Sequence, residues 1–119
     1  MTTFINGFPN ALTGQPIDEN SKPITGTYKN ISSGTGTVTT SGTPVQITAT
    51  STEAKAIDII NPTSNADVIV IGGSNVSYAS NIGIPIEPGF TYRIQITDAS
   101  KVWVDPKGNG YIFSYNLLW

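Results

Sequence analysis

The chain is organised around residues Asp67–Thr97, DVIVIGGSNVSYASNIGIPIEPGFTYRIQIT. Its first apolar run, Val68–Ile71, stops at a Gly-Gly pair, and a loop rich in Ser and Asn follows. A Pro-Gly pair then separates the short apolar segment Ile84–Ile86 from the alternating run Tyr92–Ile96. Gly, Pro and Asn favour turns, whereas alternation with a period of two is typical of a half-buried strand. The stretch therefore predicts a strand, a loop, a short edge strand, a tight turn and a further strand.

The rest of the chain has the composition of one small all-β domain. Of its 119 residues 38% are apolar and only 12% are charged, against about 25% charged in an average domain. Thr, Ser, Asn and Gly fill the difference, and Thr with Val and Ile favours strands. The chain has no Cys, so no disulfide can stabilise it. Stability must come from core burial or from partner subunits.

Residues 1–35 have a different pattern, and we expect them to form an extended N-terminal arm. Pro9, Pro16 and Pro23 exclude a continuous helix or a central strand. Large apolar residues nevertheless recur along the segment. We therefore expect the arm to lie on its own body, on a neighbouring subunit or on a larger surface; a partly disordered tail is the alternative. Its candidate partner-interface residues are Phe4, Phe8, Leu12, Ile17, Ile24 and Tyr28.

Residues 36–119 are predicted to be the β-sandwich domain. The preceding low-complexity segment, residues 31–43, suits a flexible hinge or a short first strand around residues 36–40. Further strands are predicted at residues 45–49, 54–61, 66–71, 101–105 and 111–116, with at most one helical turn near residues 51–56. About seven to eight strands joined by turns indicate a small jelly-roll-like or immunoglobulin-like β-sandwich. We favour the jelly roll because the Cys pair of immunoglobulin domains is absent.

The residues of most catalytic and metal sites are missing. Without His or Cys, Ser-His-Asp and Cys-His nucleophiles and the usual zinc sites are excluded. The eight acidic residues include no marked pair for glycoside hydrolysis, and we interpret them as solvated loop acids. The loop that begins at Asp105 fails as an EF-hand because Lys107 and Asn116 occupy ligand positions. We therefore expect neither an enzyme nor a cofactor or metal.

Charge and hydropathy make nucleic acid and membranes improbable partners. The net charge is −2, and the six Lys and Arg residues are scattered. Binding to a phosphate backbone or to an anionic membrane needs clustered cations. No run approaches the about 18 apolar residues of a membrane-spanning helix. Since the N-terminus also lacks the features of a secretory signal, we expect synthesis in the cytoplasm.

Aromatic residues near the C-terminus are the remaining candidates for a partner surface. Tyr111, Phe113 and Tyr115 alternate and so share one face of a strand, and Trp103 is expected to point outward. Trp119 ends the sequence. Large rigid aromatic side chains dominate protein interfaces, so we predict that these five residues contact a partner. For the row on the last strand, an ordinary place in the core is an equally good interpretation.

The residues from Val45 to Asn116 resemble a pattern in small virion accessory proteins of tailed bacteriophages. In that pattern an apolar strand ends in a Gly-Gly-Ser/Asn loop, and an apolar-Pro-apolar-x-Pro-Gly turn leads to the next strand. The matching residues are Gly72, Gly73, Ser74, Asn75, Val76, Ile84, Pro85, Ile86, Pro88 and Gly89. A segment of the arm, Pro16–Ile24, is also similar to such sequences.

The resemblance implies a non-enzymatic capsid decoration or cement protein, or a head-fibre type β-sandwich. Such a protein is a homo-oligomer, a trimer most often, that binds the major capsid protein or other virion proteins on the capsid surface. The arm would then attach the sandwich to the shell or to a neighbour.

Two other functions stay open. One is a glycan-binding, receptor-binding or trimerising module of a phage head or tail fibre. In that case Trp103 and Tyr78 stack on sugar rings, while Asn75, Asn81 and Asp67 bond to hydroxyl groups. The other is a head–tail adaptor component, which the sequence cannot separate from a decoration protein.

Overall fold

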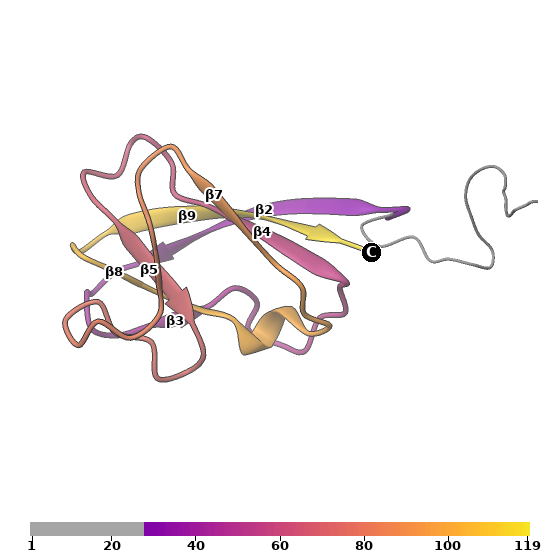
Figure 1. Ribbon diagram of the computed structural model, residues 1–119, viewed down its shortest axis with the longest axis horizontal. Helices are drawn as coiled ribbons and strands as arrows, with labels where there is room; N and C mark the ends of the chain where they lie inside the picture. The colour runs from indigo at the N-terminus through magenta and orange to yellow at the C-terminus, as the bar shows by residue number, and fades with distance from the viewer. Residues whose placement is uncertain (1–27) are drawn as a thin grey trace, which may run out of the picture.

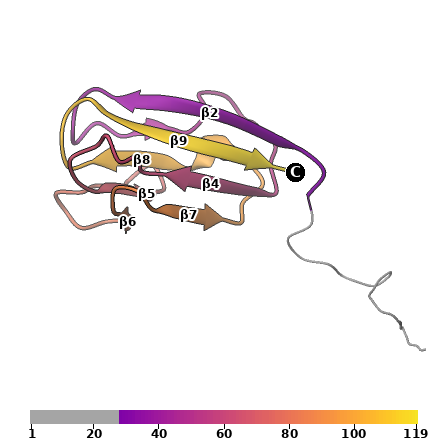
Figure 2. The same ribbon diagram turned by 90° about the horizontal axis from the view of Figure 1, so that it is seen from above.

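The computed structural model describes residues 28–119, and these form a β-sandwich. Two antiparallel sheets of four strands pack face to face, as the two views in Figures 1 and 2 show. This confirms the predicted all-β sandwich. The elements are β2 (Ile31–Val38), β3 (Val45–Gln46), β4 (Ala56–Ile60), β5 (Ile69–Gly72), β6 (Ile84–Ile86), β7 (Thr91–Ile94), the 3-10 turn η1 (Ala99–Lys101), β8 (Trp103–Pro106) and β9 (Tyr111–Leu118).

The strand order is that of a jelly roll. One sheet has the order β2-β9-β4-β7 and the other β3-β8-β5-β6. Antiparallel pairs join β2 with β9, β3 with β8, β4 with β7 and β5 with β6. The chain is therefore one long two-stranded ribbon, and rolling it up brings β4 beside β9 and β5 beside β8. This arrangement is the double-sheet jelly roll, which the absence of an immunoglobulin Cys pair had favoured.

Alternating side chains fill the space between the sheets. In β4, Ile57 and Ile59 are fully buried, while Asp58 points outward and pairs with Arg93 of β7 at 2.6 Å. Val104 of β8 is buried in the same core. Burial of each such side chain contributes about 1.5–3 kcal/mol. The core thus follows the period-two pattern that the sequence predicts.

The sandwich begins earlier than predicted. Strand β2 starts at Ile31 and pairs with β9 along its whole length, so residues 31–35 belong to the sheet and not to the arm. The hinge interpretation of this segment is wrong. Its glycines have a packing role, because a Cβ at Gly34 would lie 2.5 Å from the Tyr115 ring and one at Gly36 would collide with Phe113.

Two smaller expectations differ from the structure. No helical turn occurs near residues 51–56; the helical turn of the described chain is η1, where the Asp98 carboxylate accepts a hydrogen bond from the Ser100 N–H at 3.0 Å. The predicted strand at residues 45–49 is reduced to β3. Within residues 28–119 no helix has the length and apolar character needed to cross a bilayer. The predicted arm anchors Phe4, Phe8, Leu12, Ile17 and Ile24 lie outside the described residues.

Candidate functional site

Strands β6 and β7 lie at the same side of the sandwich (Figure 2), one in each of the two facing sheets. Each is the last strand of its sheet, and the turn at residues 87–90 joins them. Among the described residues, neither strand has a second neighbour. Edge strands present unpaired N–H and C=O groups, which can accept another chain.

Several exposed apolar side chains belong to these two strands and to the residues beside them. Of the seven large hydrophobic residues that are exposed in the described chain, four lie here: Ile82 (41%), Ile84 (39%), Phe90 (64%) and Tyr92 (41%). We call these four residues, on and beside β6 and β7, the β6–β7 edge. An exposed edge strand that carries apolar side chains favours pairing with another chain. The edge is therefore suited to contact with another protein.

A buried asparagine holds the turn between β6 and β7. Asn61 is fully buried, and its side-chain N–H groups donate to the carbonyls of Ile86 at 2.7 Å and Asp67 at 3.0 Å. Its backbone N–H donates to the Phe90 carbonyl at 3.0 Å, and its own carbonyl accepts from Gly89 at 2.6 Å. Buried polar groups with all partners in place rigidify the surrounding structure. Phe90 is thus displayed from a fixed turn.

Tyr28 packs on its own sheet. The Arg93 guanidinium of β7 lies 5.6 Å from the centre of its ring, within the range of a cation–π contact. Gln95 donates a long hydrogen bond of 3.5 Å to its hydroxyl group. The arm is expected to lie on its own body, on a neighbouring subunit or on a larger surface. Tyr28 lies on its own body.

The aromatic row of β9 is part of the core. Tyr111, Phe113 and Tyr115 share one face, as predicted, but that face points into the sandwich. Phe113 is only 1% exposed, so the prediction that it contacts a partner is wrong. The rings find room because Gly34 and Gly36 lie opposite them on β2.

The two tryptophans have different settings. Trp103 points to the outer face of its sheet, opposite to the buried Val104, and is half-buried. Trp119 is 38% exposed. Its backbone exchanges hydrogen bonds with Asn30, with N···O distances of 2.7 and 3.1 Å, which fixes it at the start of β2. A partner contact for either residue stays a prediction.

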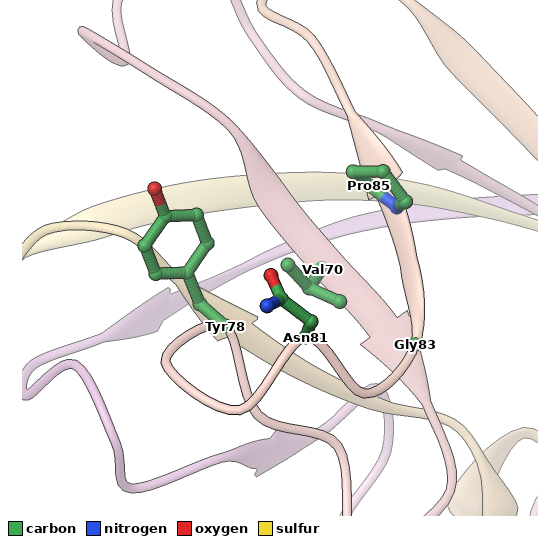
Figure 3. Close-up of a pocket in the computed structure, with 5 residues that line it drawn as sticks. All are labelled: Val70, Tyr78, Asn81, Gly83 and Pro85. Atoms are coloured by element: carbon green, nitrogen blue, oxygen red, sulfur yellow. The ribbon is translucent and has the colours of Figure 1, made fainter.

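A second candidate site is a shallow pocket on the outer face of the β3-β8-β5-β6 sheet. It has a volume of about 160 Å³ and is lined by Val70, Tyr78, Asn81, Gly83 and Pro85. Figure 3 shows the Tyr78 ring at one end, Pro85 at the other and the Asn81 amide between Tyr78 and Val70. Two of the predicted sugar-binding residues, Tyr78 and Asn81, are therefore brought together, whereas Trp103 does not line the pocket.

The loop that carries Tyr78 and Asn81 is closed by its own hydrogen bonds. Ser77 and Ile82 exchange two backbone bonds of 2.9 Å, and the Asn81 N–H donates to the Tyr78 carbonyl at 3.1 Å. Asn81 has φ = 59°, a left-handed conformation that Asn tolerates better than most residues. The loop backbone at Tyr78 and Asn81 therefore has a defined geometry.

Asp105 fixes this loop from below. It is 1% exposed, and its carboxylate oxygens accept hydrogen bonds from the backbone N–H groups of Tyr78 and Gly42, both at 2.8 Å. The sequence placed Asp105 in a solvated turn. Nothing in its local pattern reveals the burial, because both donors come from distant loops.

Asp67 and Asp98 are engaged in structural contacts, whereas Glu53 and Glu87 are exposed. Asp67, a predicted sugar ligand, pairs with Lys107 at 2.7 Å, and this hydrogen bond lowers the pKa of Asp67. Hydrogen bonds from Ser100, Ser51 and Thr52 hold the pKa of Asp98 well below its ordinary value. In the part of the chain that the structure describes, no group of three or more acidic side chains is placed to hold a metal ion.

Comparisons with protein-family models, with curated proteins and with solved structures found no match to this chain.

Proposed function

We propose that this chain is a non-enzymatic structural protein of a tailed-phage virion, a capsid decoration or cement protein on the outside of the head. The observation that carries the proposal is the β6–β7 edge, where Phe90 is 64% exposed on a rigid turn. Exposed apolar side chains beside unpaired strands favour association with protein. The jelly roll is also a common fold of viral capsid domains, which supports the proposal by analogy only.

In this proposal the body and the arm have separate roles. The β6–β7 edge joins copies of the chain into a homo-oligomer with closed symmetry, and a trimer is the form we favour because the resemblance to phage virion proteins implies it. The arm, with Phe4, Phe8 and Leu12 among its anchors, attaches the assembly to the major capsid protein. Association also stabilises a small body that has no disulfide.

The test uses phage heads that lack this protein. Adding the purified wild-type chain is expected to restore resistance of the heads to heat, and the chain is expected to sediment with them. Phe90→Ser is expected to bind and protect much less well, because a single copy attaches through one arm and loses the avidity of several linked arms. Ile31→Ser is the matched control, because Ile31 is equally exposed at 63% but lies on β2, outside the edge.

Two results would contradict the proposal. Heads that lack the protein and resist heat as well as complete heads would remove the cement role. Equal binding of Phe90→Ser and Ile31→Ser to the heads would contradict a contribution of the β6–β7 edge to attachment. Labelling of the bound protein at the neck of the particle, and not over the head surface, would favour the head–tail adaptor.

A further inference from the structure

The outer-face pocket is separate from the β6–β7 edge in its chemistry. Its lining combines the aromatic ring of Tyr78, the apolar groups of Val70 and Pro85, and the amide of Asn81. Within residues 28–119, neither the Tyr78 hydroxyl nor the Asn81 amide makes a hydrogen bond to another side chain or to the backbone. An amide offers two donors and an acceptor that takes two bonds. The pocket thus presents an apolar surface with unused polar groups beside it.

The size and charge of the pocket limit what it can hold. Its volume of about 160 Å³ is below the roughly 300–1,000 Å³ of sites for drug-sized ligands, so it accommodates a single ring. No charged residue lines it. The nearby Lys107 is neutralised by Asp67 at 2.7 Å. These properties favour a small neutral ligand.

We infer that this pocket binds one neutral sugar ring, such as the terminal hexose of a cell-surface glycan. A hexose has an apolar C–H face and a rim of hydroxyl groups. The C–H face matches the Tyr78 ring and Val70, because aromatic side chains bring large rigid apolar area. The hydroxyl rim matches the Asn81 amide, which can both donate and accept.

The site is also organised before a ligand arrives. The backbone bonds between Ser77 and Ile82 close the loop, and Asp105 holds the Tyr78 N–H at 2.8 Å. Gly83 is required at the rim, since a Cβ there would lie 2.6 Å from both Val70 and Val76. A loop whose backbone is already ordered loses less conformational entropy on binding. A small, solvent-open site of this kind suits repeated contact with many copies of a glycan.

The test is an NMR titration of the isotope-labelled full chain with a panel of neutral hexoses, N-acetylhexosamines and deoxyhexoses at millimolar concentration. At least one sugar is expected to shift the signals of the Asn81 side chain and of the Gly83 amide. Tyr78→Ala is expected to weaken that binding about tenfold or more, and Tyr78→Phe to retain most of it, because stacking depends on the ring.

Two further variants complete the design. Asn81→Gly keeps the left-handed backbone accessible and removes only the amide, so it is expected to weaken binding to a similar degree. Tyr92→Ala removes an exposed aromatic ring from the β6–β7 edge and is expected to leave sugar binding unchanged.

The inference would be overturned if no sugar in the panel shifts the pocket signals, or if Tyr78→Ala binds sugar as tightly as the wild type does. An oligoproline peptide, added as a second probe, would overturn it by shifting these signals when the sugars do not. None of these results bears on the association of copies through the edge.

Discussion

The two sides of the sandwich use their large apolar residues in opposite ways. Beside β2, the rings of Phe113 and Tyr115 turn inward over Gly34 and Gly36, and the outer face of the strand carries mainly Ser and Thr. At the β6–β7 edge, Phe90 and its neighbours stay outside the core. The aromatic row of β9 therefore stabilises the body, whereas the rest of the described chain leaves the residues of the β6–β7 edge exposed.

The largest effect is expected for Phe113→Ala. The side chain is 1% exposed in the core, and removal of a buried Phe costs about 3–5 kcal/mol of unfolding free energy. Urea denaturation measures the loss, with Tyr92→Ala at the opposite side as the control, for which a change of about 0.5 kcal/mol or less is expected. Similar losses of unfolding free energy in Phe113→Ala and Tyr92→Ala would contradict the difference between the β9 row and the β6–β7 edge.

A smaller loss is expected for Gly36→Ala. The added Cβ collides with the Phe113 ring, and overpacking of this kind costs about 1–3 kcal/mol. Gly73→Ala is the matched control, because the nearest atom to a Cβ there is the Asn75 Oδ1 at 3.6 Å. Equal thermal midpoints for the two variants would contradict the packing role of the β2 glycines.

The stability of the fold is expected to depend on pH through Asp98, which follows β7 and is hydrogen-bonded to the segment at Ser51 and Thr52. Ser51 donates to Asp98 at 2.9 Å, and this bond, with those from Ser100 and Thr52, lowers the pKa of Asp98 from 3.8. Because the pKa is lower in the folded state, the ionised carboxylate stabilises the fold above about pH 4. That stabilisation is lost as the pH falls toward the folded-state pKa.

Asp98→Asn tests this dependence. The variant is expected to be less stable than the wild type at neutral pH, and the gap in unfolding free energy is expected to narrow near pH 3. Chemical denaturation at the two pH values measures both gaps. A gap that is the same at both pH values would show that the charge of Asp98 contributes nothing.

The smallest effect on stability is expected for Phe90→Ser. The side chain is 64% exposed, and surface substitutions usually change the unfolding free energy by about 0.5 kcal/mol or less. Thermal unfolding of a dilute sample, where the chain is a monomer, checks this expectation. A loss of several kcal/mol would mean that Phe90 supports the fold of the body and is not held for a partner.

The sequence predicts the parts of this fold that depend on local patterns. The alternation of Ile57, Asp58 and Ile59 sets the two faces of β4, and Pro88-Gly89 sets the turn between β6 and β7. Both signals act within a few residues. The missing Cys pair favours the jelly roll over the immunoglobulin fold, and the strand order agrees.

The parts that were missed depend on distant partners. The Gly34 and Gly36 pattern is typical of a flexible hinge until Tyr115 and Phe113 lie over it, and those rings come from the last strand. Likewise, the buried carboxylate of Asp105 depends on hydrogen bonds from the N–H groups of two distant loops. Phe90 shows no sequence feature that separates it from a core phenylalanine; only its position on the turn leaves it exposed.

We propose that the β6–β7 edge holds copies of this chain together. Light scattering on a sizing column gives the native mass of the full chain in three forms: wild type, Phe90→Ser and Ile31→Ser. We expect an oligomer, a trimer in the favoured form, for the wild type and Ile31→Ser, and a monomer for Phe90→Ser. A monomeric wild type, or a Phe90→Ser variant that assembles as the wild type does, would contradict it.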